Sequence, residues 1–288
     1  MRVQLGYQPP LAAGPLFAFL GDRAIPGVET FDGRTFRRAI RTKAGEVAVI
    51  ALAPHPSREQ ITLEVSTDDA VADDEVVETA LRLLDLDADP ATIDAVLARD
   101  PVLRARVLAT PGIRLPGAVD GFELAVRAVL GQQVSIRAAR TFAGRIAEQI
   151  GTRIPKRLAV EGITHVFPTP DQLATAPLDQ IGLTRRRIDT LHRLSELASA
   201  GDLDISATVD AETTKRKLLD IQGIGPWTVS YIAMRSLRDL DAFPATDLGV
   251  KLGSEALGLP TRPREIRDRA ERWRPWRGYA VMHLWNAP

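Results

Sequence analysis

Residues 217–250 read KLLDIQGIGPWTVSYIAMRSLRDLDAFPATDLGV, and this stretch decides how the rest of the chain is interpreted. An apolar helical pattern ends at Ile221, and a Gly-x-Gly turn follows at Gly223 and Gly225. Pro226 then stands at the first position of a second helix. Such a turn brings backbone N–H groups to the surface at a helix N-terminus, where an anion is favoured. The pattern predicts a helical hairpin that can hold a phosphate, although a plain turn between two helices would use the same glycines.

The hairpin lies within a long helical region that begins near Asp89. Apolar residues recur there at i, i+3 and i+4, and Pro or Gly breaks the pattern at short intervals. We expect helices over residues 90–98, 101–109, 120–130, 135–150, 170–176, 185–200, 211–221, 226–237, 246–257, 263–273 and 276–285.

The first third of the chain has a different pattern, of strands with few helices. Residues 36–41, 46–53 and 60–66 are strand-like, and Val3 and Leu5 add a strand at the start. The unbroken apolar run 47–53 suits a strand buried on both faces, whereas residues 61–65 alternate as a half-buried strand does. Helical patterns begin at Pro15 and cover 71–86.

These patterns predict an α+β N-terminal domain, a small antiparallel sheet with helices, over residues 1–88. An all-α helix–hairpin–helix core follows over residues 89–288. The core could divide into two helical subdomains around an active-site cleft.

The composition excludes several classes of protein. None of the 288 residues is cysteine, so disulfides, thiol nucleophiles, zinc–thiolate sites and iron–sulfur clusters are excluded. The four histidines show no metal-binding spacing. No apolar run reaches the ~18–20 residues of a membrane span, and Gly14 and Pro15 interrupt the nearest candidate for a signal peptide. We expect a cytoplasmic protein with no membrane partner.

The net charge of zero hides a polarity. Residues 1–110 hold 12 Lys/Arg and 17 Asp/Glu, a net of −5, and residues 111–288 hold 25 and 20, a net of +5. The basic residues cluster at 185–187, at 215–217 and in a series of arginines between Arg262 and Arg277. They are either solvated helix faces or a phosphate-binding side, and charge alone does not decide between the two.

Residues 217–250 resemble the helix–hairpin–helix of the DNA glycosylase superfamily that also contains endonuclease III, because Gly223, Gly225, Pro244 and Asp247 match its pattern in order and spacing. A closer resemblance, to the 3-methyladenine DNA glycosylase II family of the AlkA type, covers nearly the whole chain. It rests on YQPPL and FLGDRAIPGVET near the start, RLPGAVDGFELAVRAVLGQQVS at 114–135 and AERWRPWRGYAVMHLW at 270–285.

The resemblance implies a DNA-3-methyladenine glycosylase, an N-glycosylic hydrolase of base excision repair that acts on double-stranded DNA with alkylated bases. It implies that the backbone of Gly223, Ile224 and Gly225 grips a phosphate. It also implies an optional Na⁺ or K⁺ at the hairpin backbone from Gln222 to Gly225, and no other cofactor. We expect a monomer. Some members of this family carry a further N-terminal methyl-acceptor domain, which the sequence does not address.

Asp247 is the catalytic carboxylate that the resemblance implies. Cleavage of an N-glycosidic bond builds positive charge on the sugar, which a carboxylate can stabilise. The alternative is a helix N-cap, since Thr246 and Asp247 precede an apolar helical pattern. Both roles can hold at once.

The resemblance assigns a base pocket to Phe19, Trp227, Tyr231 and Trp285, where electron-rich rings would stack on a cationic alkylated purine. Core packing is the alternative for each of these rings. Gln133 matches the position of the residue that is wedged into the DNA when the nucleotide is flipped out, and otherwise it is an exposed residue at a helix start.

Trp227 stands where bifunctional relatives have a Schiff-base lysine, which predicts a monofunctional enzyme. Asn286 and Thr246 depart from the family pattern and leave the substrate range open. The alternatives are therefore a glycosylase for oxidised or deaminated bases, or a DNA-binding module without catalysis.

Overall fold

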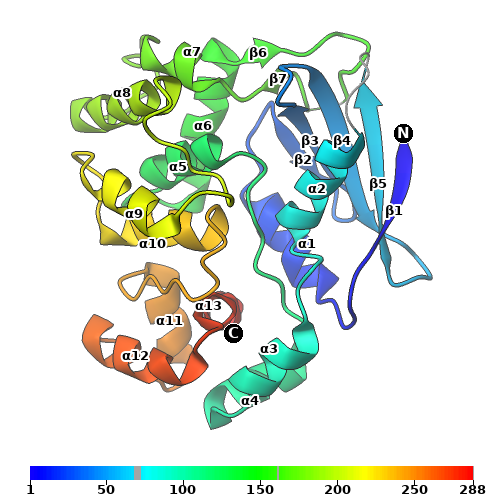
Figure 1. Ribbon diagram of the computed structural model, residues 1–288, viewed down its shortest axis with the longest axis vertical. Helices are drawn as coiled ribbons and strands as arrows, with labels where there is room; N and C mark the ends of the chain where they lie inside the picture. The colour runs from blue at the N-terminus through cyan, green and yellow to red at the C-terminus, as the bar shows by residue number, and fades with distance from the viewer. Residues whose placement is uncertain (68–72, 161, 288) are drawn as a thin grey trace.

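The computed structural model describes residues 1–67, 73–160 and 162–287 (Figure 1). The strands are β1 (Arg2–Gly6), β2 (Glu29–Phe31), β3 (Phe36–Arg41), β4 (Val47–Pro54), β5 (Gln60–Thr67), β6 (Thr152–Arg153) and β7 (His165–Val166). The helices are α1 (Ala13–Asp22), α2 (Asp73–Leu84), α3 (Pro90–Leu97), α4 (Pro101–Ala109), α5 (Gly121–Leu130), α6 (Ile136–Ile150), α7 (Pro170–Ala174), α8 (Arg185–Ser199), α9 (Ala211–Leu219), α10 (Pro226–Arg235), α11 (Leu248–Ala256), α12 (Pro263–Ala270) and α13 (Arg277–Trp285), with a 3₁₀ turn at Glu271–Trp273.

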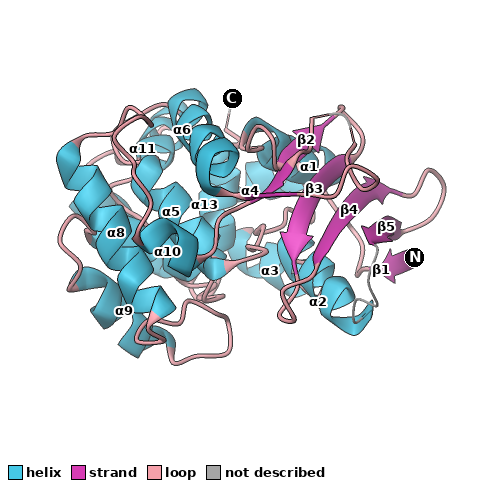
Figure 2. Ribbon diagram, turned by 90° about the horizontal axis from the view of Figure 1, so that it is seen from above, coloured by secondary structure: helices cyan, strands magenta, loops and turns pink. Residues whose placement is uncertain are grey.

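An antiparallel sheet of the order β1-β5-β4-β3-β2 lies on one side of the molecule, and the helical core lies on the other (Figure 2). The expected strands are confirmed, and the structure adds the three-residue strand β2. In β4, Ile50 packs into the main core while its neighbour Val49 packs into a second, smaller cluster. The run 47–53 is therefore buried on both faces, as its lack of alternation predicts.

The second face of the sheet is covered by the segment between α6 and α7. Here the helical part departs from a purely α structure, because β6 and β7 form a two-stranded ribbon. Ile154, Ile163 and Val166 pack on Ala39 and Val49 of the sheet. The backbone N–H of His165 donates to the Gly27 carbonyl, 3.0 Å away. Strands of two residues are too short to leave a sequence pattern.

The expected helices are present, with small differences at their ends. Helix α1 begins at Ala13, two residues before Pro15. Proline is tolerated throughout the first turn because the N–H groups there have no intrahelical partner. The expected helix over 71–86 is α2, and residues 71–72 lie outside the described residues. No helix in the described part of the chain is both long and apolar enough to cross a membrane.

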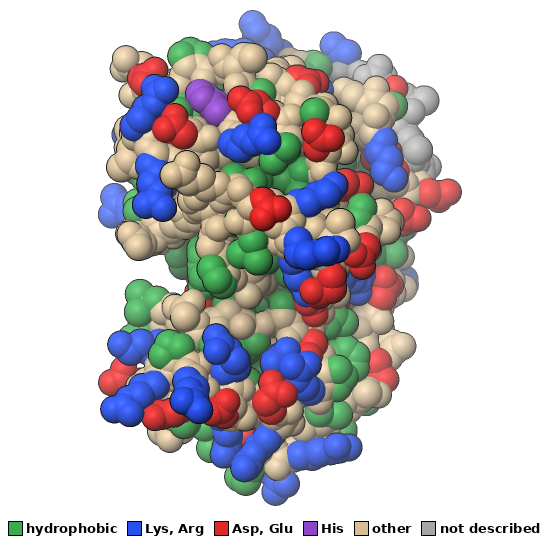
Figure 3. Space-filling model, turned by 60° about the vertical axis from the view of Figure 1, so that its left-hand side comes forward, with side chains coloured by type: hydrophobic (Ala, Val, Ile, Leu, Met, Phe, Trp, Pro, Cys, Tyr) green, Lys and Arg blue, Asp and Glu red, His purple; other side chains and the backbone are tan. Residues whose placement is uncertain are grey.

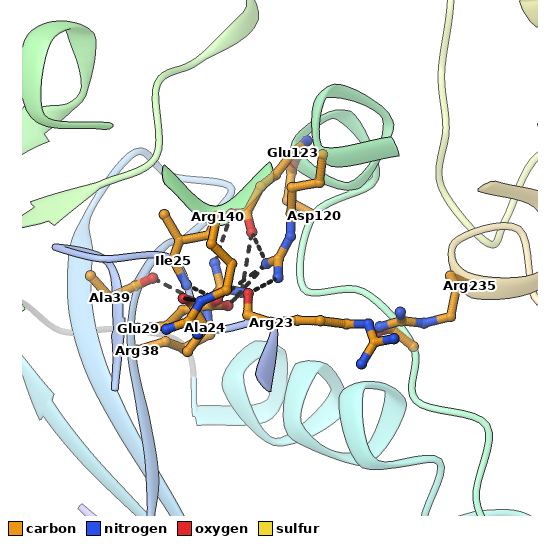
Figure 4. Close-up of polar contacts among 12 residues, drawn as sticks. Arg23, Ala24, Ile25, Glu29, Arg38, Ala39, Asp120, Glu123, Arg140 and Arg235 are labelled. Carbon is orange, nitrogen blue, oxygen red and sulfur yellow. Dashed lines mark hydrogen bonds and ion pairs between the residues drawn. The ribbon is translucent and has the colours of Figure 1, made fainter. Parts of the chain in front are cut away.

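A buried charge network joins the sheet to the helical core (Figure 4). Arg38 of β3 lies 2.7 Å from Glu29 of β2 and 2.7 Å from Glu123 of α5. Arg127 of α5 contacts the same two carboxylates, at 3.2 and 3.0 Å. Removing one member would leave a buried charge uncompensated, at a cost of about 3–5 kcal/mol.

His283 of α13 is fully buried, and neither ring nitrogen has a hydrogen-bond partner among the described residues. Burial, and secondly the charge of Arg106, lower the pKa of His283 to about 4. The unfolded chain takes up this proton near pH 6.5. The contribution of neutral His283 is thus complete above pH 6.5 and is lost as the pH falls from 6.5 to 4.

We predict that acidification over this range costs the wild type about 3 kcal/mol of unfolding free energy that the variant His283→Phe does not lose. Denaturant unfolding at pH 7.5 and at pH 4.5 measures both proteins. Equal losses in the two proteins would contradict the assignment to His283.

Candidate active site

A cleft of about 1340 Å³ opens between the N-terminal helix α1, the loop from α5 to α6, the hairpin and helix α11. Figure 3 shows one face hollowed across its middle, with hydrophobic side chains at the edges of the hollow and many Lys and Arg side chains below it. The cleft brings together eight of the residues expected from the sequence, namely Phe19, Gln133, Gly223, Gly225, Trp227, Tyr231, Asp247 and Trp285.

Asp247 is the N-cap of α11 and also lies in the cleft. One carboxylate oxygen accepts hydrogen bonds from the Val250 N–H at 2.9 Å and from the Trp285 indole N–H at 2.8 Å. The other accepts from the Trp227 indole N–H at 2.8 Å. Both roles weighed from the sequence are thus compatible with this geometry, and the two tryptophans hold the carboxylate in one orientation.

Gly249 follows in the first turn of α11 and was not expected to matter. A Cβ at Gly249 would lie 2.6 Å from Cδ1 of Trp285 and 3.1 Å from a carboxylate oxygen of Asp247. The absence of a side chain therefore permits the bond between the indole and the carboxylate. A glycine inside a helix lowers the stability of the helix. A glycine within the expected helix over 246–257 is therefore the sequence signal that could have pointed to Gly249.

The four expected pocket aromatics form a contiguous cluster. Phe19 stacks on Trp285, with ring centroids 5.9 Å apart, and Trp227 stacks on Tyr231 at 5.7 Å. Tyr231 and Trp285 lie 6.2 Å apart at a tilted angle. Two arginines that sequence reasoning missed, Arg23 and Arg235, place their guanidinium groups against these rings.

The hairpin uses its two glycines differently. Gly223 has φ +97°, and a Cβ there would lie 2.1 Å from Oγ1 of Thr190. Gly225 has an extended backbone and no atom within 4 Å of its would-be Cβ. Gly223 is thus required by the fold, whereas Gly225 leaves open space in front of the N-terminus of α10, which has no side-chain cap.

Ile224 was expected to take part in the phosphate grip, but its side chain and its N–H group point into the protein. Its side chain is buried in the core, and its N–H donates to the Ile221 carbonyl at 3.0 Å. Neither group faces the cleft, so the hairpin has Gly223 and Gly225 available for an external ligand.

Gln133 stands exposed in the loop between α5 and α6, with φ +55°. The preceding Gln132 fixes this loop to the hairpin, because its amide donates to the Gly223 carbonyl and to Oγ1 of Thr228, both at 2.9 Å. Arg187 donates to the Gln132 carbonyl at 2.7 Å. The roles of Gln132 and Arg187 were not expected, and side-chain amides leave no sequence signal of such a contact.

Several of the clustered basic residues have carboxylate partners. Arg269 contacts Asp100 at 2.6 Å, and both Arg274 and Arg277 contact Asp241. Lys215 contacts Asp239. These basic side chains are therefore paired with carboxylates of the same fold. For this part of the series, the interpretation as structural or solvated helix faces is favoured over a phosphate-binding side.

Comparison with known proteins gives two family matches. The description of the first is "AlkA N-terminal domain", over residues 2–120, and that of the second is "HhH-GPD superfamily base excision DNA repair protein", over residues 126–277.

Several relatives cover nearly the whole chain. A Mycobacterium tuberculosis protein named probable bifunctional transcriptional activator/DNA repair enzyme AlkA is 40% identical over 99% of this chain, which spans only 57% of that relative. The DNA-3-methyladenine glycosylase 2 of Escherichia coli is 33% identical, covering 98% of this chain and 95% of its own length. The solved 3-methyladenine DNA glycosylase from Archaeoglobus fulgidus has a TM-score of 0.80 at 22% identity, over 99% of this chain and 97% of that one.

Proposed function

Because the chain belongs to the HhH-GPD superfamily of base excision DNA repair proteins, we propose that it is a monofunctional DNA glycosylase that hydrolyses the N-glycosidic bond of alkylated purines such as 3-methyladenine. The observation that carries the proposal is the Asp247 carboxylate, which three N–H groups hold in the cleft beside an aromatic cluster. The N-cap role needs only the bond from Val250, whereas the two indole bonds orient the carboxylate inside the cleft, which favours catalysis over a DNA-binding module without it.

Asp247 would act mainly through its charge. As the bond between C1′ and the base breaks, positive charge develops on the sugar, and a fixed carboxylate lowers the energy of that state. Three hydrogen bonds occupy part of the lone pairs of Asp247, which makes it a weaker nucleophile. The oxygen bound only to Trp227 keeps one lone pair free to orient the attacking water.

The DNA partner would be a duplex with the damaged nucleotide flipped into the cleft. The open space at Gly225, in front of an uncapped helix N-terminus, suits a backbone phosphate oxygen. Gln133, exposed and next to the anchored Gln132, would fill the gap that the flipped base leaves.

A monovalent cation fits the hairpin. The carbonyls of Gln222 and Gly223 each accept one hydrogen bond, from Thr190 and Gln132, and a carbonyl oxygen has two lone pairs. The remaining lone pairs would hold Na⁺ or K⁺, whose charge attracts a phosphate oxygen.

We further propose that the protein acts as a monomer in the cytoplasm, on nucleoid DNA.

The test is the incubation of the protein with duplex DNA that contains an alkylated purine. We expect release of the free base and an abasic site, with strand breakage only after alkali. Since Trp227 occupies the position of the lysine, borohydride should trap no covalent adduct between protein and DNA. An adduct would refute the monofunctional mechanism, and the absence of any base release would refute the glycosylase itself.

A further inference from the structure

Two guanidinium groups lie against the aromatic cluster of the cleft. Cζ of Arg23 is 3.8 Å from the centroid of the Phe19 ring and 5.8 Å from that of Trp285. Cζ of Arg235 is 4.7 Å from the Phe19 ring and 5.8 Å from the Tyr231 ring. Figure 4 shows the side chains of Arg23 and Arg235 extending toward each other.

Neither guanidinium has a carboxylate partner among the described residues, in contrast to Arg38 and Arg127. Arg235 donates to the carbonyls of Pro116 and Gly117 and to the Tyr231 hydroxyl. Burial lowers the pKa of Arg235 to about 10 and also lowers the pKa of Arg23. Arginine stays charged at neutral pH, so each of the two guanidinium groups places a positive charge against the aromatic cluster.

The rings of Phe19 and Trp285 leave no slot for a base between them. A base sandwiched between two rings needs their planes roughly 7 Å apart, which is twice a van der Waals separation of about 3.5 Å. The near-parallel pair of Phe19 and Trp285 has centroids 5.9 Å apart at an interplanar angle of 12°. A base therefore cannot enter between Phe19 and Trp285, and Arg23, which lies against both of these rings and lines the cleft, is within reach of a base that stacks beside them.

Of the two arginines, Arg23 is the one that can respond to the base. Arg235 is 5% exposed and is fixed by carbonyls of a neighbouring segment. Arg23 is partly exposed at the C-cap of α1, and its guanidinium donates a long hydrogen bond of 3.4 Å to the Phe19 carbonyl four residues earlier and is also hydrogen-bonded to the Tyr231 side chain.

We propose that Arg23 is a specificity-determining residue of the base pocket: its guanidinium assists the departure of an uncharged damaged base and disfavours a cationic one. The inference rests on the proposed glycosylase function. When the bond between C1′ and nitrogen breaks, its electron pair leaves with the base, and water supplies hydroxide to C1′ and a proton to the departing base or the solvent. An uncharged base leaves as an anion, which Arg23 stabilises, whereas a cationic base leaves neutral and gains nothing from Arg23.

The experiment compares two duplexes, one with a single 7-methylguanine, which is cationic, and one with a single hypoxanthine, an uncharged purine. We measure single-turnover rates of base release by the wild type, by Arg23→Gln and by Arg23→Lys. The ratio of the uncharged to the cationic rate should fall at least about 10-fold in Arg23→Gln. Arg23→Lys keeps the positive charge but lacks the planar guanidinium. Its ratio of rates should lie between those of the wild type and Arg23→Gln. Arg2→Gln, which removes one positive charge at the exposed sheet edge, should leave the ratio unchanged.

An unchanged ratio in Arg23→Gln, or two rates that fall together, would overturn the role of Arg23 while leaving the glycosylase standing. Wild-type release of the cationic base alone would overturn it as well. Wild-type release of neither base would instead overturn the proposed function, and the inference with it. If the melting temperature shows that Arg23→Gln does not fold, the same comparison on Arg23→Lys decides.

Discussion

Replacing Asp247 by Asn is expected to lower the rate of base release by about 100- to 1,000-fold. The variant removes the negative charge that faces the developing positive charge on the sugar. Its one amide oxygen can still accept from Val250 and Trp285, but its NH₂ group then faces the indole N–H of Trp227, donor against donor. Single-turnover release of 3-methyladenine from methylated duplex DNA measures the effect, and affinity for abasic duplex should change little.

A second variant separates charge from geometry. Trp227→Phe keeps an aromatic ring and removes the donor, so the double variant with Asp247→Asn has no clash between donors. If loss of charge is the cause, the double variant stays as slow as Asp247→Asn. Recovery of activity in the double variant would show that the clash caused the loss, and wild-type rates in Asp247→Asn would exclude Asp247 from the mechanism.

The two hairpin glycines should respond in opposite ways to the same substitution. Gly223→Ala places a Cβ against Thr190 at a backbone φ of +97°, and we expect a loss of about 1–3 kcal/mol in unfolding free energy. Gly225→Ala meets no atom of the protein, so its unfolding free energy should stay within about 0.5 kcal/mol of the wild type.

Gly225→Ala is instead expected to weaken binding to abasic duplex roughly tenfold, because its Cβ occupies the approach of the phosphate. Denaturant unfolding and titration of labelled DNA, run on both variants, provide the comparison. Wild-type affinity in Gly225→Ala would show that the phosphate does not approach there.

The sequence was sufficient for those elements whose boundaries are marked by local chemistry. Pro at helix starts and Asp or Ser caps locate the core helices, and the lack of alternation in 47–53 identifies β4 as a strand with two buried faces. Strands β2, β6 and β7 have two or three residues each, and their pairing depends on contacts with distant segments. No local pattern could have located them.

The residues of the candidate site likewise divide into those that the sequence could predict and those that depend on contacts between distant segments. The family pattern placed Asp247 and the aromatics, but not the two indole bonds to the carboxylate, which join residues 20 and 38 positions apart. Arg23 and Arg235 were missed because charged side chains are normally assigned to the surface. Only tertiary structure shows that they lie on aromatic rings inside the cleft.

The buried charge network has a consequence for how the two halves of this chain can be exchanged with those of relatives. Glu29 and Arg38 belong to the half that ends at 120, Arg127 belongs to the half that begins at 126, and Glu123 lies in the gap between the two family matches. A chimera joined at this gap inherits the two charged residues of the sheet, Glu29 and Arg38, from one parent. It inherits Arg127 of helix α5 from the other parent. Unless the parents agree at all four positions, the hybrid buries an unbalanced charge, so the halves are expected to be inherited as one unit.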